Sequence, residues 1–183
     1  MANNLSLSRR RFLQFGIGAT TSLSLPSTFA NILAEPERKL SLINLHTGES
    51  LNTTYWAEGH YQASELAAIN RILRDHRTGD IYHIDHDLID MLNILHYKMK
   101  GNQPFQVISG YRSPKTNAKL SQKSSGVAKK SLHMQGKAID IRLPGRQLSE
   151  LRKTALNLHI GGVGYYPKSN FIHIDTGRVR HWG

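Results

Sequence analysis

The segment Ser131-Leu132-His133-Met134-Gln135-Gly136-Lys137-Ala138-Ile139-Asp140-Ile141 places an imidazole and a carboxylate on the two sides of a glycine. Gly136 permits a tight turn because it has no Cβ, and the apolar residues that follow predict a strand over residues 138–143. In that strand Asp140 lies between two isoleucines, so its side chain points to the face opposite theirs. We therefore expect Asp140 to point into a cleft.

The chain contains no cysteine and ten histidines, so a zinc site must be built from imidazoles and carboxylates. Catalytic zinc takes three protein ligands and keeps a fourth position open for water. His133 and Asp140 offer two ligands. His173 offers a third, because it is the polar residue at the centre of an apolar strand predicted over residues 171–175. Two strands with inward polar groups would form a rigid floor for a metal.

Spacing alone does not identify this pair, because His-x6-Asp occurs twice in the chain. The other copy is His83 with Asp90. Asp90 falls inside a predicted amphipathic helix whose entrance also contains Asp85, His86 and Asp87. These side chains resemble metal ligands, but helix capping and solvation explain them better.

The remaining pattern predicts an α+β fold with a small antiparallel sheet and flanking helices. Strand and helix signals mix without a strand–helix–strand rhythm, which argues against a doubly wound sheet. A hairpin is predicted where residues 40–45 and 51–56 flank a glycine-bearing turn. Apolar spacing predicts helices that contain residues 64–73, 88–99, 114–120 and 148–158, and a polar, basic loop over 119–130. Residues 161–166 and 171–175 are expected to pair as closing strands.

The first thirty residues are typical of an export signal. Arg9-Arg10-Arg11-Phe12-Leu13 precedes a short, weakly apolar stretch that Pro26 interrupts and that ends in small residues. The paired arginines resemble a twin-arginine (Tat) signal, whose substrates cross the membrane folded. We expect residues 1–30 to be this signal, 31–38 a linker and 39–183 one folded domain, located in the periplasm.

Composition limits the partners. The 183 residues carry 24 Lys+Arg against 13 Asp+Glu, a formal net charge of +11, and the expected signal removes three arginines and no acid. A basic exported protein favours an anionic wall or envelope surface. No recognition helix or aromatic platform points to nucleic acid, and no run of 18 apolar residues is present. We expect a monomer without a membrane segment once the signal is removed.

The motif Ser-x-His-x2-Gly-x-Ala-x-Asp resembles the zinc D-Ala-D-Ala peptidase family. It is preceded by Ser109-Gly110-Tyr111-Arg112-Ser113 and followed by the His-x-Asp strand. That family has a LAS-type fold, which lysostaphin-like enzymes and the hedgehog signalling domain share. From Asn44-Leu45-His46-Thr47-Gly48-Glu49-Ser50 to Arg180-His181-Trp182, the chain is similar to the bacterial murein endopeptidase K group.

This resemblance implies a Zn²⁺ ion held by His133, Asp140 and His173, and hydrolysis of peptide bonds in peptidoglycan stems. It also implies that Arg112 lies in the cleft, where fixed donors would stabilise the oxyanion. Relatives place a general-base Glu three residues before the last zinc His, or a His two before it. Here those positions are Asn170 and Phe171.

The proton acceptor is therefore open. Asp175 shares a strand face with His173 and is expected either to take a proton or to orient a ligand. His181, near the C-terminal end, is the other catalytic candidate. Ser131 is expected to hydrogen-bond near His133, and the glycines at 161–164 to allow close backbone approach or a bulge.

Three activities remain compatible with the sequence. The leading hypothesis is a zinc-dependent endopeptidase that cuts cross-links between stem peptides. The bond would be either D-Ala–diaminopimelate or diaminopimelate–diaminopimelate. A D-Ala-D-Ala carboxypeptidase would use similar chemistry. A non-catalytic wall-binding module that retains the fold is favoured by the absent glutamate.

Overall fold

The computed structural model describes residues 34–124 and 126–183. The expected export signal, residues 1–30, and the first three residues of the expected linker lie outside this part. The strands are β1 Glu37–Asn44, β2 Ser50–Ala57, β3 His60–Tyr61, β4 Phe105–Ser109, β5 Ala138–Arg142, β6 Gly162–Tyr166, β7 Phe171–Asp175 and β8 Arg180–Trp182. The helices are α2 Ala63–Ile72, α3 His86–Lys98, α4 Pro114–Lys123 and α5 Leu148–Leu156, with short 3-10 helices η1 Leu132–Gln135 and η2 Pro167–Ser169.

The α+β class is confirmed, but the sheet is neither small nor wholly antiparallel. Its eight strands follow the order β3-β2-β1-β4-β5-β7-β6-β8. β1 pairs with β4 in parallel, and β6 pairs with β8 in parallel. The first parallel pair arises because α2 and α3 return the chain across the sheet between β3 and β4, as a parallel connection requires. The second involves β8, a three-residue strand too short to leave a pattern in the sequence.

The domain begins earlier than the sequence predicted, so the linker assignment is wrong for its last two residues. Strand β1 starts at Glu37, and Arg38 is only 7% exposed. The Arg38 guanidinium bonds to both carboxylate oxygens of Asp90, at 3.1 and 3.0 Å. A buried ion pair to α3 therefore fixes the start of the sheet.

The core lies between the sheet and helices α3 and α5, which pack on each other and on the strands. Helix α3 begins where predicted, because the Asp85 carboxylate accepts a hydrogen bond from the Asp87 amide and caps it. Its buried face includes Leu88, Leu92 and Leu95, all at 0% exposure. Burying one such side chain contributes about 1.5–3 kcal/mol relative to leaving it in water.

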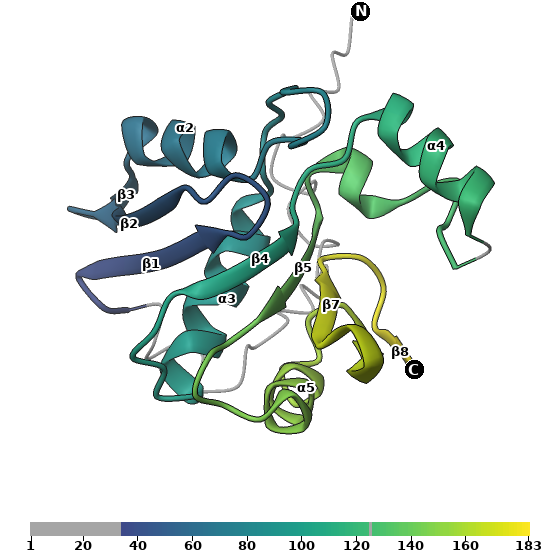
Figure 1. The fold of residues 1–183 in the computed structure, drawn as a ribbon. Coiled ribbons are helices and arrows are strands. Elements are labelled where there is room, and N and C mark those ends of the chain that lie inside the picture. Colours follow the sequence, from purple (N-terminus) through teal and green to yellow (C-terminus); the bar gives the residue numbers. More distant parts are fainter. Residues whose placement is uncertain (1–33, 125) are drawn as a thin grey trace, which may run out of the picture.

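Helix α4 lies at the upper right of Figure 1, away from the body of the sheet. Ser113 caps it, because its hydroxyl oxygen accepts a hydrogen bond from the Thr116 amide, and Pro114 occupies its first turn. It continues to Lys123, so the first part of the expected basic loop is helical. In the described part of the chain, no helix is long and apolar enough to cross a membrane.

Candidate metal centre

The candidate metal centre is built on one row of the sheet, meaning residues that are partners of one another across adjacent strands. Register pairs Ser109 of β4 with Asp140 of β5, and Asp140 with His173 of β7. The same row continues from His173 to Gly164 of β6 and on to Trp182 of β8. The neighbours of Asp140 and His173 along their strands are buried isoleucines of the core. Alternation therefore turns these two polar side chains to the other face of the sheet.

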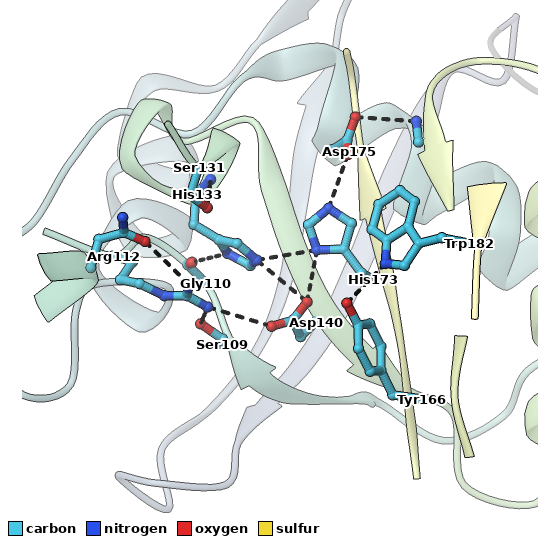
Figure 2. Close-up of polar contacts among 12 residues, drawn as sticks. Ser109, Gly110, Arg112, Ser131, His133, Asp140, Tyr166, His173, Asp175 and Trp182 are labelled. Carbon is cyan, nitrogen blue, oxygen red and sulfur yellow. Dashed lines mark hydrogen bonds and ion pairs between the residues drawn. The ribbon is translucent and has the colours of Figure 1, made fainter. Parts of the chain in front are cut away.

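Three side chains converge at this row, as Figure 2 shows. His133 Nε2 is 3.2 Å from His173 Nδ1 and 3.3 Å from Asp140 Oδ1, while His173 Nδ1 is 2.9 Å from Asp140 Oδ1. Within the described residues this is the only group of three His, Asp or Glu side chains arranged to share a metal ion. The structure thus brings together the three residues that the sequence singled out as ligands.

His133 reaches this point from a short segment with fixed ends. Ser131 caps the start of η1, and its hydroxyl oxygen accepts a hydrogen bond from the His133 amide at 3.3 Å, as the sequence suggested. Gly136 ends η1 in the left-handed region, with φ of 66°. The chain then enters β5 directly. A four-residue turn therefore holds the imidazole above the carboxylate of the next strand.

Hydrogen bonds on the far side of each ring assign its tautomer. His133 Nδ1 is 2.8 Å from the Gly110 carbonyl oxygen, which can only accept, so Nδ1 carries the hydrogen. His173 Nε2 is 2.9 Å from Asp175 Oδ2. We assign the hydrogen to that nitrogen, because a carboxylate is an acceptor. In the neutral rings, His133 Nε2 and His173 Nδ1 therefore carry no hydrogen, and their lone pairs point toward Asp140.

This donor set fits a zinc ion. Two lone pairs and a carboxylate oxygen at such short separations repel one another unless a cation or a proton lies between them. Zinc bonds of about 2.0–2.1 Å in a tetrahedron would place neighbouring ligand atoms about 3.3 Å apart. The observed separations of 2.9, 3.2 and 3.3 Å are close to that value. Histidines that donate their other nitrogen to a carbonyl or carboxylate are also typical of metal ligands.

The electrostatics of the cluster are strongly coupled. Burial alone would raise the pKa of Asp140, but the two histidines outweigh it and hold that pKa well below the usual range. Burial likewise would lower the pKa of His173, whereas its hydrogen bonds to Asp140 and Asp175 raise it. Asp140 is therefore an anion, as a metal-binding carboxylate must be.

Arg112 lies beside the three side chains, as the resemblance implied. Its Nη2 is 3.8 Å from Asp140 Oδ2, and its guanidinium also contacts Asn117 and Ser109, at 3.4 Å each. Its backbone amide donates to the His133 carbonyl, which joins the turn before α4 to η1. Burial lowers the pKa of Arg112, although the Asp140 carboxylate acts in the opposite direction.

Asp175 lies behind His173. It is fully buried, and Arg180 holds it through two contacts of 3.0 and 2.7 Å. The amides of Gly162 and Gly177 donate to the same carboxylate. Burial by itself would raise the pKa of Asp175, but the hydrogen bonds from His173, Arg180 and the Gly177 amide outweigh it and lower that pKa. The arrangement matches the orienting alternative that the sequence left open for Asp175, because the carboxylate does not line the pocket.

The structure does not bring His181 to the cluster. Arg180 and Trp182 both line the pocket, so alternation turns His181, between them in β8, to the opposite side, where it is exposed. The second His-x6-Asp pair is also far from a shared site. His83 is exposed, whereas Asp90 accepts hydrogen bonds from Arg38, Tyr55 and Tyr61. The expectation that Asp90 is a solvated helix residue is therefore wrong.

A pocket of about 450 Å³ opens over the cluster. Its basic lining residues are Arg112, Lys130 and Arg180. Its aromatic wall, which the sequence pattern does not predict, consists of Tyr166, Phe171 and Trp182. The three aromatic residues belong to three separate strands, so no local sequence motif predicts the wall. One sequence signal was available, because Gly164 leaves space above its strand.

That space is filled by Trp182. A Cβ on Gly164 would lie 2.6 Å from the indole Cε2, closer than real side-chain contacts allow. The close approach predicted at residues 161–164 is therefore confirmed. The atoms that approach these glycines belong to side chains of β8 as well as to the backbone. Gly162 makes similar room for the Asp175–Arg180 pair.

Fold and site together define an α+β protein with a His–Asp–His candidate metal centre beneath a basic, aromatic-walled pocket. The family model described as peptidoglycan L,D-endopeptidase MepK matches residues 33–182. The MepK protein of Escherichia coli K12, named a peptidoglycan L,D-endopeptidase, is 46% identical over 175 residues, which cover 95% of this chain and 96% of the relative. A probable MepK of Haemophilus influenzae is 38% identical over 182 residues, covering 98% of each chain. This chain belongs to the MepK family of the LAS-type M15 peptidases.

Proposed function

We propose that this protein is a zinc-dependent peptidoglycan L,D-endopeptidase that hydrolyses peptide cross-links between stem peptides. The observation that carries the proposal is the convergence of His133, Asp140 and His173 beneath a pocket with a basic lining. Membership of a family whose curated relatives are named for this activity supports it. The relatives cover almost the same length, so the similarity is not confined to one motif.

Zinc would be held by His133 Nε2, Asp140 and His173 Nδ1, and when bound it would supply an activated water and a polarised carbonyl. The other residues position groups around that centre. The Gly110 carbonyl and the Asp175 carboxylate hold the two imidazoles in the required tautomers. Arg180 in turn fixes Asp175.

Arg112 would stabilise negative charge on the carbonyl oxygen of the scissile bond. Its guanidinium is fixed by Ser109, Asn117 and Asp140 before any substrate arrives, so little reorganisation is needed. Its Nε is buried and makes no hydrogen bond within the described residues. A permanent cation at this position also attracts the carboxylates of stem peptides.

The name of the relatives favours one cross-link. An L,D bond joins an L-configured acyl group to a D-configured amine. The direct diaminopimelate–diaminopimelate cross-link has this configuration, whereas in the D-Ala–diaminopimelate cross-link the acyl group is D. We propose the direct cross-link as the substrate.

Domain organisation is part of the same proposal. Residues 1–30 would direct export through the twin-arginine pathway, and the remainder would act on the wall in the periplasm as a monomer. Export in a folded state would allow the metal to be acquired before the protein reaches the wall.

The test is digestion of purified muropeptides that carry either cross-link, with and without a chelator, followed by mass spectrometry. We expect monomers only from the direct cross-link, and only without chelator. Equal cleavage in chelator would reject the zinc proposal. Release of D-Ala alone would indicate a carboxypeptidase, and binding to sacculi without any product would indicate a wall-binding module.

A further inference from the structure

The Trp182 indole donates a hydrogen bond to the Tyr166 hydroxyl oxygen at 2.9 Å (Figure 2). An indole N–H can only donate, so the tyrosine oxygen accepts in this contact. A phenol has one proton of its own to donate. Among the described residues, Tyr166 makes no hydrogen bond as a donor, so that proton remains available to a group in the pocket.

The tyrosine ring is held in one orientation. It stacks on Phe171 with centroids 4.6 Å apart and an interplanar angle of 19°. The Trp182 indole, seated over Gly164, also contacts the His173 ring at 5.3 Å between centroids. Aromatic contacts and one directional hydrogen bond therefore fix the hydroxyl before substrate binds.

The hydroxyl also belongs to the reacting region of the pocket. Tyr166 lines the same pocket as His133, Asp140 and His173. The Arg112 guanidinium lines this pocket as well, 3.8 Å from Asp140 Oδ2. A neutral donor on β6 and a cation on the segment between β4 and α4 thus face one pocket.

The geometry points to Tyr166 as a further catalytic residue, whose hydroxyl donates a hydrogen bond to the carbonyl oxygen of the scissile amide as negative charge develops there. This inference rests on the proposed function. The tyrosine keeps its proton throughout, so it acts as a fixed donor beside Arg112. Trp182 is a positioning residue, because it occupies the tyrosine lone pair and so directs the O–H bond toward the pocket.

The decisive variant is Tyr166→Phe, which keeps the ring and its stacking on Phe171. Loss of one fixed oxyanion donor lowers kcat by about 100- to 1,000-fold in other enzymes, and we expect a loss of that order with little change in KM. The matched control is Tyr165→Phe. Tyr165 immediately precedes Tyr166 and lies on the other face of β6, where its ring centroid is 4.8 Å from the Arg152 guanidinium carbon. Its removal should leave kcat unchanged, and Trp182→Phe should give a smaller loss than Tyr166→Phe.

Two readouts do not depend on turnover. The chain has two tryptophans, so the indole N–H signal of Trp182 can be assigned in a nuclear magnetic resonance spectrum by comparison with Trp56→Phe. In metal-free Tyr166→Phe this signal should move upfield and exchange faster with water. Zinc content and the unfolding midpoint of the variant should match the unsubstituted protein.

The outcomes separate the inference from the function on which it rests. If the unsubstituted protein cleaves neither cross-link, the proposed function fails and the role of Tyr166 fails with it. If it is active and Tyr166→Phe is equally active, only the role of Tyr166 is overturned. A loss of activity that merely follows a loss of zinc or of stability would likewise assign Tyr166 a structural role.

Discussion

Asp140 and His173 lie directly opposite each other on the adjacent strands β5 and β7, with 2.9 Å between Oδ1 and Nδ1. Cross-strand partners are set by register, and a slip of one residue would turn both side chains into the core. Four isoleucines that alternate with these residues, Ile139, Ile141, Ile172 and Ile174, are all 0% exposed. Burial of these isoleucines therefore locks the polar pair into place.

His133→Ala is expected to abolish zinc binding and cleavage while leaving the fold largely intact. The substitution removes one of three proposed ligands from a short 3-10 helix, which the Ser131 cap and Gly136 still define. Zinc content by mass spectrometry and muropeptide cleavage measure the effect. The matched control is His83→Ala, from the other His-x6-Asp pair, which should keep both properties. A fully active His133→Ala variant would remove the assigned site.

Asp175→Asn is expected to weaken zinc binding about 10- to 100-fold, the usual effect of losing an outer hydrogen-bond partner of a ligand. The amide loses the charge that fixes the His173 tautomer and pairs with Arg180. Competition with a chromophoric chelator gives the affinity. Glu49→Gln, which removes a carboxylate paired with Arg74 elsewhere in the fold, should not change it. Unaltered affinity in Asp175→Asn would contradict an orienting role.

Asp90→Ala is expected to destabilise the fold by about 3–5 kcal/mol without affecting zinc binding. Removing one partner of a buried ion pair leaves an uncompensated charge. Asp90 satisfies Arg38 and the hydroxyls of Tyr55 and Tyr61, and the pKa of Tyr61 is raised to about 12 by burial and by this carboxylate. Urea unfolding gives the loss. A variant as stable as the parent would show that the network is not structural.

The buried carboxylate of Asp75 should make stability depend on pH in the acid range. It accepts the amides of Ser113 and Arg77, each at 2.9 Å. Burial by itself raises the pKa of Asp75, but the hydrogen bonds from Thr116, Ser113 and Arg77 outweigh it and lower the pKa. A depressed folded-state pKa stabilises the protein above the unfolded value of about 3.9 and loses that effect as pH falls below it.

Asp75→Asn should therefore be less stable than the parent by about 1–3 kcal/mol at pH 7, since a hydrogen-bonded buried charge is lost. The difference in unfolding free energy should shrink below about pH 4. Urea unfolding of both proteins from pH 2.5 to 7 gives the comparison. A difference that stays constant, or grows on acidification, would contradict the assignment.

The local sequence pattern was sufficient to predict much of the structure of this protein. Alternation around Asp140 and His173 correctly predicted polar side chains on apolar strands, and their convergence with His133 could be anticipated from the motif. The hairpin of β1 and β2 and the capped start of α3 also followed from turn and capping residues. The strand alternation, the hairpin and the helix cap depend on neighbours within a few residues, where periodicity and capping carry the information. The convergence of His133 with His173, 40 residues further along the chain, was expected instead from the resemblance to the zinc peptidase family.

Other features that depend on distant partners, and that no family motif marks, were missed. Asp90 looked solvated because its partner Arg38 lies 52 residues away in the sequence. His181 seemed catalytic because nothing in a three-residue strand shows which way its side chains alternate. The aromatic wall escaped notice for the same reason, since Tyr166 and Trp182 meet only through the parallel pairing of β6 with β8.

Strand β8 is the edge strand of the sheet and is held to it by its pairing with β6. It brings two residues to the site: Trp182, which forms part of the aromatic wall, and Arg180, which holds Asp175 behind His173. Fraying of this edge would therefore disturb the orientation of one imidazole together with the indole beside it.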